Sequence, residues 1–208
     1  LEYFRGDPIG WEHIEMTSPD LNGGARGLTA GGTGPAPSST KTDTIQYTTL
    51  STLGNAVDFG NLDTAVDALG ACASRTRGIL NGGYTGSAVK NEIRYVTISS
   101  TGNSTDFGDM TDTHSAIADL SSQIRGIWTF GSTPVANTLE YITIASTGNS
   151  LDFGDATDGG RKNIGACASP TRGLFAGGRD GSNNLKNNID HLIIATTGNS
   201  VDFGDLTN

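Results

Sequence analysis

The chain has 208 residues and a mass of 21.5 kDa, which is enough for one sizeable hydrophobic core or two small ones. Its 13 basic and 22 acidic residues give a formal net charge of -9, and this argues against nucleic acid as a partner. No apolar run is long enough to cross a membrane, so we expect no membrane insertion. We also expect no signal peptide, because no basic stretch followed by an apolar one opens the sequence.

The dominant feature of the sequence is internal repetition. An Asp-Phe-Gly triplet occurs four times, with its phenylalanines 48, 46 and 50 residues apart, at Phe59, Phe107, Phe153 and Phe203. Within the repeats, each copy also has an Arg-Gly pair, with its arginines 51, 48 and 47 residues apart, at Arg26, Arg77, Arg125 and Arg172. We therefore expect an N-terminal extension at residues 1–10 and one domain of four repeats at residues 11–208. The repeats cover about 11–61, 62–109, 110–156 and 157–208.

Each repeat has the pattern of four short strands. In the second repeat, the first strand is a run of small apolar residues at 68–73, and the second follows Arg77-Gly78 and ends at a diglycine. The third, at residues 93–98, is β-branched and aromatic, as strands prefer. The fourth is short and ends at the Asp-Phe-Gly triplet. No segment has the apolar periodicity of a helix, so the sequence predicts an all-β protein.

Four strands in each repeat of this length are typical of a β-propeller blade. One four-stranded sheet cannot bury both of its faces alone, but stacked sheets bury them against one another. We therefore predict a β-propeller of four four-stranded blades, with the four repeated phenylalanines filling the gaps between blades. The sequence leaves open whether these blades close a ring or belong to a larger one. It also leaves open an offset cut, in which residues 11–18 complete the last blade.

The repeat resembles the kelch repeat. Kelch units have a diglycine after the second strand and an aromatic residue in the third, and this sequence has Gly31-Gly32, Gly82-Gly83 and Gly177-Gly178, with Tyr47, Tyr95 and Tyr141. The third repeat departs from the pattern, because it keeps only Gly131, and the fourth has His191 in place of tyrosine. No repeat has the kelch tryptophan of the fourth strand.

A closer resemblance is to repeat arrays in virion proteins of tailed bacteriophages, marine ones above all. The string from Tyr141 to Asp155, YITIASTGNSLDFGD, carries this resemblance. The resemblance covers all four copies, which make up about nine-tenths of the chain. The resemblance implies a structural or tail-fibre-like component of the virion, assembled in the host cytoplasm, or otherwise extracellular. Its partners would be other virion proteins, or a glycan or protein of the host surface, and it could form oligomers. It implies no catalytic residue.

Length variation between the repeats falls mainly in one loop, between the diglycine and the third strand. These loops are residues 33–44, 84–92, 132–138 and 179–188. Equivalent loops of a propeller leave the same face, and insertions gathered on one face often mark a binding face. The ligand-binding candidates are Tyr84, Lys90, Arg179, Asp180, Asn183 and Asn184. The alternative is unselected variation in solvated loops.

Metal and cofactor chemistry finds little support in the sequence. The paired acids around each phenylalanine, such as Asp106 and Asp109, could hold Ca²⁺, but Asx turns are the preferred interpretation. Cys72 and Cys167 would lie on opposite sides of a four-bladed ring, so we expect no disulfide. The three histidines have no zinc-site spacing. We therefore expect no metal and no cofactor.

Three functions remain as hypotheses. The first is a non-enzymatic virion protein that serves surface attachment or protein–protein interaction. The second is a free, lectin-like propeller that binds carbohydrate through its variable loops. The third is an enzyme with a site at the mouth of the axis, which would need one asymmetric cluster of acids or histidines that the repeats do not show.

Overall fold

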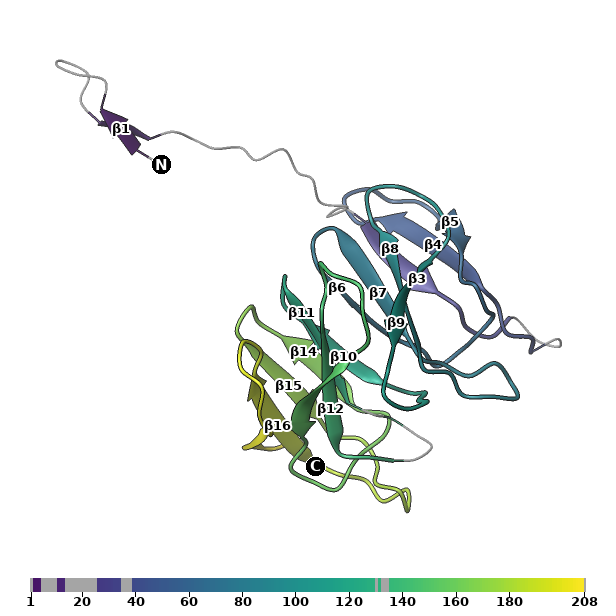
Figure 1. The fold of residues 1–208 in the computed structure, drawn as a ribbon, viewed down its shortest axis with the longest axis vertical. Helices are drawn as coiled ribbons and strands as arrows, with labels where there is room; N and C mark the ends of the chain where they lie inside the picture. Colours follow the sequence, from purple (N-terminus) through teal and green to yellow (C-terminus); the bar gives the residue numbers. More distant parts are fainter. Residues whose placement is uncertain are drawn as a thin grey trace.

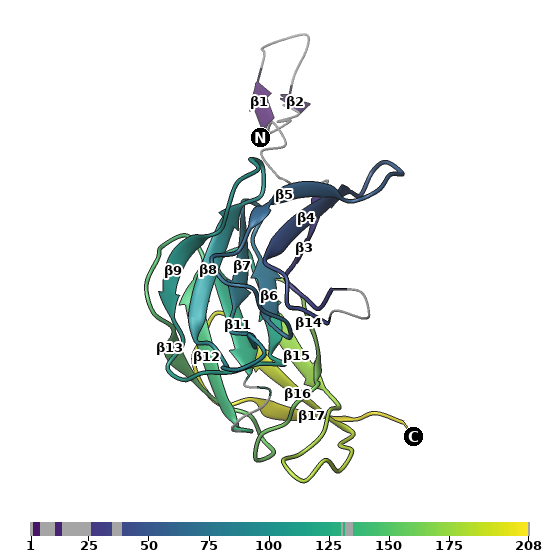
Figure 2. The ribbon, with the colours of Figure 1, turned by 90° about the vertical axis from the view of Figure 1, so that its right-hand side faces the viewer.

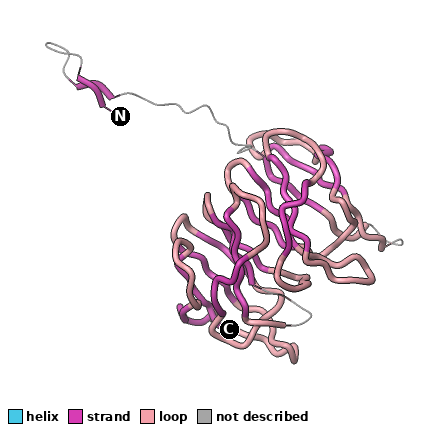
Figure 3. Tube along the Cα trace, viewed as in Figure 1, coloured by secondary structure: helices cyan, strands magenta, loops and turns pink. Residues whose placement is uncertain are grey.

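The structure is a computed structural model, and it describes residues 2–4, 11–13, 26–34, 39–129, 131 and 135–207. These residues form strands and loops, with no helix among them (Figure 3). The first two strands, β1 (Glu2–Phe4) and β2 (Trp11–His13), pair antiparallel with each other. Residues 11–13 therefore extend a separate two-stranded sheet, and residues 14–18, the rest of the segment considered for an offset blade, lie outside the described residues.

Four antiparallel sheets follow, and the strands of each come from a single repeat. The first sheet contains β3 (Arg26–Ala30), β4 (Thr44–Thr49) and β5 (Val57–Asn61). The second sheet contains β6 (Gly70–Ala73), β7 (Arg77–Asn81), β8 (Glu92–Thr97) and β9 (Thr105–Asp109). The first sheet has three described strands where the sequence predicts four. The predicted first strand, at residues 11–17, is not described in this sheet, because residues 11–13 form β2, which pairs with β1, and residues 14–17 lie outside the described residues.

The third sheet contains β10 (Ala118–Ser121), β11 (Arg125–Thr129), β12 (Thr138–Thr143) and β13 (Leu151–Asp155). The fourth sheet contains β14 (Gly165–Ala168), β15 (Arg172–Ala176), β16 (Asn188–Ile193) and β17 (Val201–Asp205). The four sheets stand one behind another in chain order, from the purple and blue first sheet to the yellow fourth sheet (Figures 1 and 2). The protein is therefore all-β, with four sheets of three or four strands in a propeller-like arrangement.

A β-bulge marks every Asp-Phe-Gly triplet. In the second sheet, Ile93 pairs with Gly108 and Arg94 pairs with Asp106, so Phe107 is an extra residue that faces no partner. The other three sheets shift register at the same place. A bulge bends its strand and redirects a side chain, and this turns the phenylalanine toward the neighbouring sheet.

Three hydrophobic clusters lie between the four sheets, and each contains one of these phenylalanines. Phe59 packs with Leu80 and Val96 of the second sheet. Phe107 and Phe153 pack in the same way against the third and the fourth sheet, respectively. Each of the first three sheets therefore buries one face against the sheet that follows it in the chain.

The fourth phenylalanine does not fill such a gap, although the sequence predicts that it should. Phe203 is exposed, whereas the other three phenylalanines are buried. The physical reason is that the described chain has no sheet beyond β17 to cover it. The buried core is thus confined to the three interfaces between successive sheets.

Candidate functional site

The variable loops all leave the sheets at the same end of the second strand. Beyond the diglycine, three of them continue as a short hairpin, closed by backbone bridges between Thr33 and Lys41, Tyr84 and Val89, and Arg179 and Leu185. Gly82 and Gly83 have φ angles of 59° and 105°, a region that favours glycine, and they turn the chain from β7 into its hairpin. The six ligand-binding candidates lie in two of these hairpins, after β7 and after β15.

Tyr84 belongs to a cluster that braces two loops. Its backbone pairs with Asp67, at 2.8 and 3.0 Å between nitrogen and oxygen, and its hydroxyl donates to the Gly86 carbonyl at 2.6 Å. The Lys41 ammonium pairs with the Asp67 carboxylate and lies 5.8 Å from the centre of the Tyr84 ring. The Thr33 hydroxyl also donates to this carboxylate, at 2.9 Å. Both the backbone and the hydroxyl of Tyr84 are therefore engaged within the protein.

The charge of Asp67 fits its place in this cluster. Partial burial opposes ionisation of its carboxyl group, but hydrogen bonds from Lys41 and Thr33 outweigh this effect and hold its pKa below the ordinary value. Lys41 and Asp67 were not among the residues singled out from the sequence. Lys41 lies in the first variable loop, so the sequence identified the loop as part of a candidate binding face but did not identify Lys41 itself.

Lys90 supports the base of the second hairpin. Its ammonium pairs with Glu92 at 2.8 Å, and its backbone amide donates to the Gly83 carbonyl at 2.9 Å. Burial opposes ionisation of Glu92, but the hydrogen bond from Lys90 outweighs it and lowers the pKa of that carboxyl group. Lys90 and Tyr84 therefore lie in one hairpin, where each helps to hold its shape.

The other four candidates form one self-contained loop after β15. Asp180 Oδ1 accepts hydrogen bonds from the amides of Ser182 and Asn184, both at 2.9 Å, and its Oδ2 accepts one from Asn184 Nδ2 at 3.0 Å. These hydrogen bonds, from Asn184 above all, lower the pKa of Asp180. Arg179 donates to the Asn183 carbonyl at 3.0 Å. The loop is thus held by an Asx-type network of its own polar groups.

The Asp-Phe-Gly triplet forms a second kind of site, at the junction of two sheets. Asp106 Oδ1 accepts a hydrogen bond from the Gly108 amide at 3.2 Å, which is the Asx turn that the sequence favoured over a calcium site. Asp152 and Asp202 accept equivalent bonds, at 3.1 and 3.0 Å. Gly108 has φ 146°, and a Cβ atom on it would lie 2.5 Å from the carbonyl oxygen of Gly148 in the third sheet. Only glycine allows this close approach.

A turn for which the sequence predicted no role in joining the sheets completes this junction. It joins the third and fourth strands of the next sheet and contains Gly148 and Asn149, and we call it the linking turn. The Gly148 amide donates to the Phe107 carbonyl at 2.7 Å, and the Ser150 amide donates to the Asp109 carbonyl at 2.9 Å. The Asp109 amide donates to Asn149 Oδ1 at 3.0 Å. The Gly-Asn pair of this turn recurs in every repeat, and this recurrence is the sequence feature that could have identified the turn as part of the junction.

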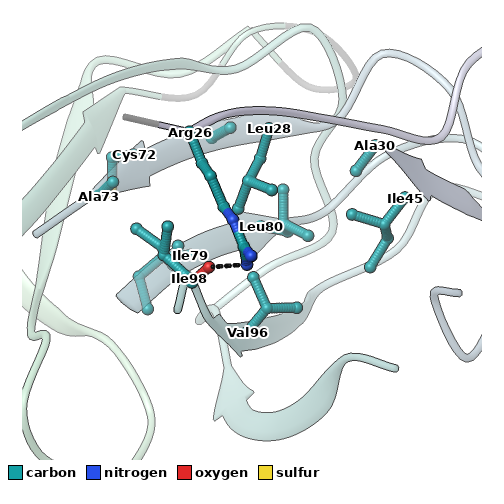
Figure 4. A pocket seen from close by; sticks show the side chains of 12 residues that line it. Arg26, Leu28, Ala30, Ile45, Cys72, Ala73, Ile79, Leu80, Val96 and Ile98 are labelled. Carbon is teal, nitrogen blue, oxygen red and sulfur yellow. Dashed lines mark hydrogen bonds between the residues drawn. The ribbon is translucent and has the colours of Figure 1, made fainter. Parts of the chain in front are cut away.

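The arginine of each Arg-Gly pair forms the other connection between sheets. Arg26, Arg77 and Arg125 each donate to an isoleucine carbonyl of the next sheet, at 2.8, 2.9 and 2.9 Å. Each guanidinium also lies over the tyrosine ring of its own sheet, at 4.5, 4.5 and 4.7 Å from the ring centre. Figure 4 shows the bond from Arg26 to Ile98. The Arg-Gly motif is therefore structural in these three sheets.

An apolar cavity of about 210 Å³ lies beside Arg26, between the first and second sheets (Figure 4). At the next two interfaces, a residue of the preceding sheet's first strand packs on the equivalent glycine: Cys72 on Gly126, and Leu120 on Gly173. Gly78 lines the cavity and meets no such residue of the described chain. The cavity thus corresponds to the position that a residue of the preceding first strand fills at the next two interfaces.

Other reactive groups are dispersed or structural. Within the described ranges, no three His, Cys, Asp or Glu side chains gather as metal ligands would. Cys72 and Cys167 are both free, as predicted. The buried pair of Arg161 and Asp190 ties two loops together, because Arg161 also donates to the carbonyls of Gly177 and Asn188, both at 2.9 Å. No helix in the described chain is long and apolar enough to cross a membrane.

Comparison with models of protein families found no match to this chain, and comparison with curated proteins found none either.

Proposed function

We propose that the chain is a non-enzymatic structural protein of a phage virion, a tail-fibre-like module whose four sheets are kelch-like propeller blades. In this proposal it serves attachment to a surface or to other virion proteins. The observation that carries the proposal is the use of the repeated residues. In the first three repeats, the phenylalanine and glycine of the Asp-Phe-Gly triplet and the arginine of the Arg-Gly pair make contacts that join one sheet to the next. Such contacts suit a stiff scaffold rather than a reaction centre.

The variable loops support an attachment role. They leave one end of a scaffold that is repeated along the chain, and loops held by a rigid framework are the usual carriers of binding. Their polar side chains brace the loops internally, through pairs such as Lys41 with Asp67 and Lys90 with Glu92. Such bracing lowers the entropy lost on contact with a partner.

The virion assignment is tested on the particle. An antibody raised against the purified chain is used to label gradient-purified particles of the phage that encodes it, and the particle proteins are identified by mass spectrometry. The proposal expects the chain in the particles at a fixed ratio to the capsid protein, with the label on an appendage. A chain found only in the soluble fraction of infected cells would contradict it.

Carbohydrate binding is a second candidate, favoured by the hairpin that carries Tyr84. Its aromatic ring is only half-buried, and it stands beside Lys41, Thr33 and Asp67 at the loop end of the sheets. An aromatic face with polar neighbours suits a sugar. A glycan array compares the unmodified chain with Tyr84→Ala, and Arg75→Ala at the opposite end of the sheet serves as control. This candidate expects binding that only Tyr84→Ala reduces; absence of binding, or equal loss in both variants, would contradict it.

A further inference from the structure

The last sheet exposes the same residues that the other sheets bury. Phe203 is 54% exposed, whereas Phe59, Phe107 and Phe153 are each 2% exposed. Leu206 is 44% exposed, and its counterpart in the first repeat, Leu62, is 4% exposed. A Cβ atom on Gly204 would meet nothing within 4 Å, whereas at Gly108 it would collide with the next linking turn. The fourth sheet therefore carries one half of an interface without the other half.

The polar groups on the same face of the fourth sheet also lack, within the described chain, the partners that their counterparts have at the internal interfaces. Arg172 is exposed, and among the described residues its side chain makes no hydrogen bond like those of Arg26, Arg77 and Arg125. The internal interfaces also use the carbonyl of the phenylalanine, and the amide and carbonyl two residues beyond it. At the fourth sheet these groups belong to Phe203 and Asp205.

The first sheet carries the complementary half. Leu50 is 70% exposed, whereas its counterparts Ile98, Ile144 and Ile194 are 7%, 1% and 2% exposed. The linking turn of the first sheet contains Gly54, Asn55 and Ala56, at the same distance from Leu50 along the chain as Gly102 is from Ile98. A Cβ atom on Gly54 would meet nothing within 4 Å. This turn is thus complete, and it joins no other sheet of the described chain.

We infer that a second copy of this chain docks its first sheet on the fourth sheet, head to tail. Each group then has a partner of the kind found inside the chain. The Gly54 amide donates to the Phe203 carbonyl, and the Ala56 amide donates to the Asp205 carbonyl. Asn55 Oδ1 accepts from the Asp205 amide, Arg172 donates to the Leu50 carbonyl, and Leu50 covers the Phe203 ring. The inference rests on the fold and does not depend on the proposed function.

Complementarity favours this contact over one between two identical ends. Two fourth sheets face to face would leave the Phe203 carbonyls without a linking turn, because the linking turn of the fourth sheet, with Gly198, is already joined to Phe153. A head-to-tail contact is heterologous, so repetition produces either a closed ring of copies or an open chain of them.

The docked contact is weaker than the internal interfaces. The first sheet has Thr29 and Thr48 at the positions where the second has Leu80 and Val96, which pack against Phe59 in the first interface. Threonine buries less apolar surface than these residues, so association is reversible and depends on concentration.

Sedimentation velocity of the purified chain over a range of concentrations tests the inference. The unmodified chain is expected to self-associate, and Phe203→Asp and Leu50→Asp are each expected to remain monomeric. Ile124→Asp is the matched control, because Ile124 is 66% exposed in the turn between β10 and β11 of the third sheet, which takes no part in either docking face. All three side chains are exposed, so the variants should keep the circular dichroism spectrum of the parent. Thr48→Val should tighten association roughly fivefold, since it replaces a hydroxyl with a methyl group.

Mixing the two monomeric variants separates head-to-tail docking from other contacts. Phe203→Asp keeps an intact first sheet and Leu50→Asp keeps an intact fourth sheet, so an equimolar mixture should form a complex of one copy of each and grow no further. A chain that stays monomeric at every concentration overturns the inference. So does a mixture that stays monomeric, or a loss of association in Ile124→Asp equal to that in Phe203→Asp. A monomer whose melting temperature falls in Phe203→Asp would show that the two ends meet within one chain, which also overturns it.

Discussion

The amide nitrogen of Gly148 lies 2.7 Å from the carbonyl oxygen of Phe107, and this hydrogen bond joins the third sheet to the second. The same bond links Gly102 to Phe59 and Gly198 to Phe153, also at 2.7 Å. Phe107 is the extra residue of a β-bulge, so it is left out of its own ladder and is available to the next sheet. Bulge, aromatic side chain and linking turn therefore act as one unit of assembly.

Replacing the buried phenylalanines should destabilise the protein strongly. Phe107→Ala or Phe153→Ala removes a ring that fills an interface between sheets, and we expect a loss of about 3–5 kcal/mol in the free energy of unfolding. Urea denaturation followed by circular dichroism measures this loss. Phe203→Ala is the internal control: its ring is exposed, so at low protein concentration its effect should be much smaller. Equal losses at Phe107 and Phe203 would show that the phenylalanines do not act through packing between sheets.

Replacing the glycine after the phenylalanine separates backbone strain from docking. Gly108→Ala places a side chain at φ 146° and also pushes it against the Gly148 carbonyl. Gly204→Ala has nearly the same φ, 139°, but its Cβ atom would be in open space. We expect about 1–3 kcal/mol from the strained backbone in both variants, and a clearly larger loss in Gly108→Ala. Thermal melts of the two variants give the comparison, and identical melts would contradict the close approach.

Arginine should not be replaceable by lysine at the junctions. Arg77 donates to the Ile144 carbonyl at 2.9 Å while its flat guanidinium stacks over Tyr95. Lysine keeps the charge but loses the flat group that makes both contacts, so Arg77→Lys should lose about 1 kcal/mol. Arg172→Lys should change the stability of the monomer little. Chemical denaturation tests both, and an Arg77→Lys variant as stable as the parent would refute this role.

Much of the fold could be predicted from the sequence because the repeat exposes it. The third strand of the second repeat, predicted at residues 93–98, is β8 (Glu92–Thr97), one residue earlier. The β-branched and aromatic run decides this strand locally. The pairing of β7 with β8 and of β8 with β9 follows from their succession in the repeat.

The environment of each copy could not be predicted, because it depends on the neighbouring sheet. Phe153 and Phe203 have almost the same local sequence, yet one is buried and the other is exposed. The variable-loop residues were predicted from residue type, and type alone does not tell whether a polar group is already partnered. Asp180, for example, accepts its hydrogen bonds from its own loop.

The carboxyl group of Asp119, in the first strand of the third sheet, should be protonated at mildly acidic pH. Asn81 Nδ2 donates to Asp119 Oδ1 at 2.7 Å. Asp119 Oδ2 and Asn81 Oδ1 both lie close to Gly70, and Asn81 Oδ1 has no hydrogen-bond partner in the described chain. Burial raises the pKa of Asp119 to about 7, and the hydrogen bonds from Asn81 and the Ala71 amide oppose this only in part. The protonated Oδ2 can then donate to Asn81 Oδ1, so the two side chains form a doubly hydrogen-bonded pair.

This pair gives the stability a defined pH dependence. The folded pKa of Asp119 lies above the value of 3.8 in the unfolded chain, so the folded state favours the protonated form. The contribution of Asp119 is therefore complete below about pH 4, falls as the pH rises, and is lost above pH 7. Asp119→Asn keeps a donor toward Asn81 at every pH. Between pH 4 and pH 8, the variant should gain roughly 2–4 kcal/mol relative to the parent.

The measurement is a series of urea denaturation curves of parent and Asp119→Asn from pH 3 to pH 8. Asp180→Asn provides a control of opposite sign, because hydrogen bonds from Asn184 lower the pKa of Asp180 and favour its ionised form. Its stability relative to the parent should therefore fall, not rise, as the pH increases from 3 to 5. If the difference between parent and Asp119→Asn stays constant over the whole range, Asp119 is ionised in the folded protein, and its pairing with Asn81 does not include a shared proton.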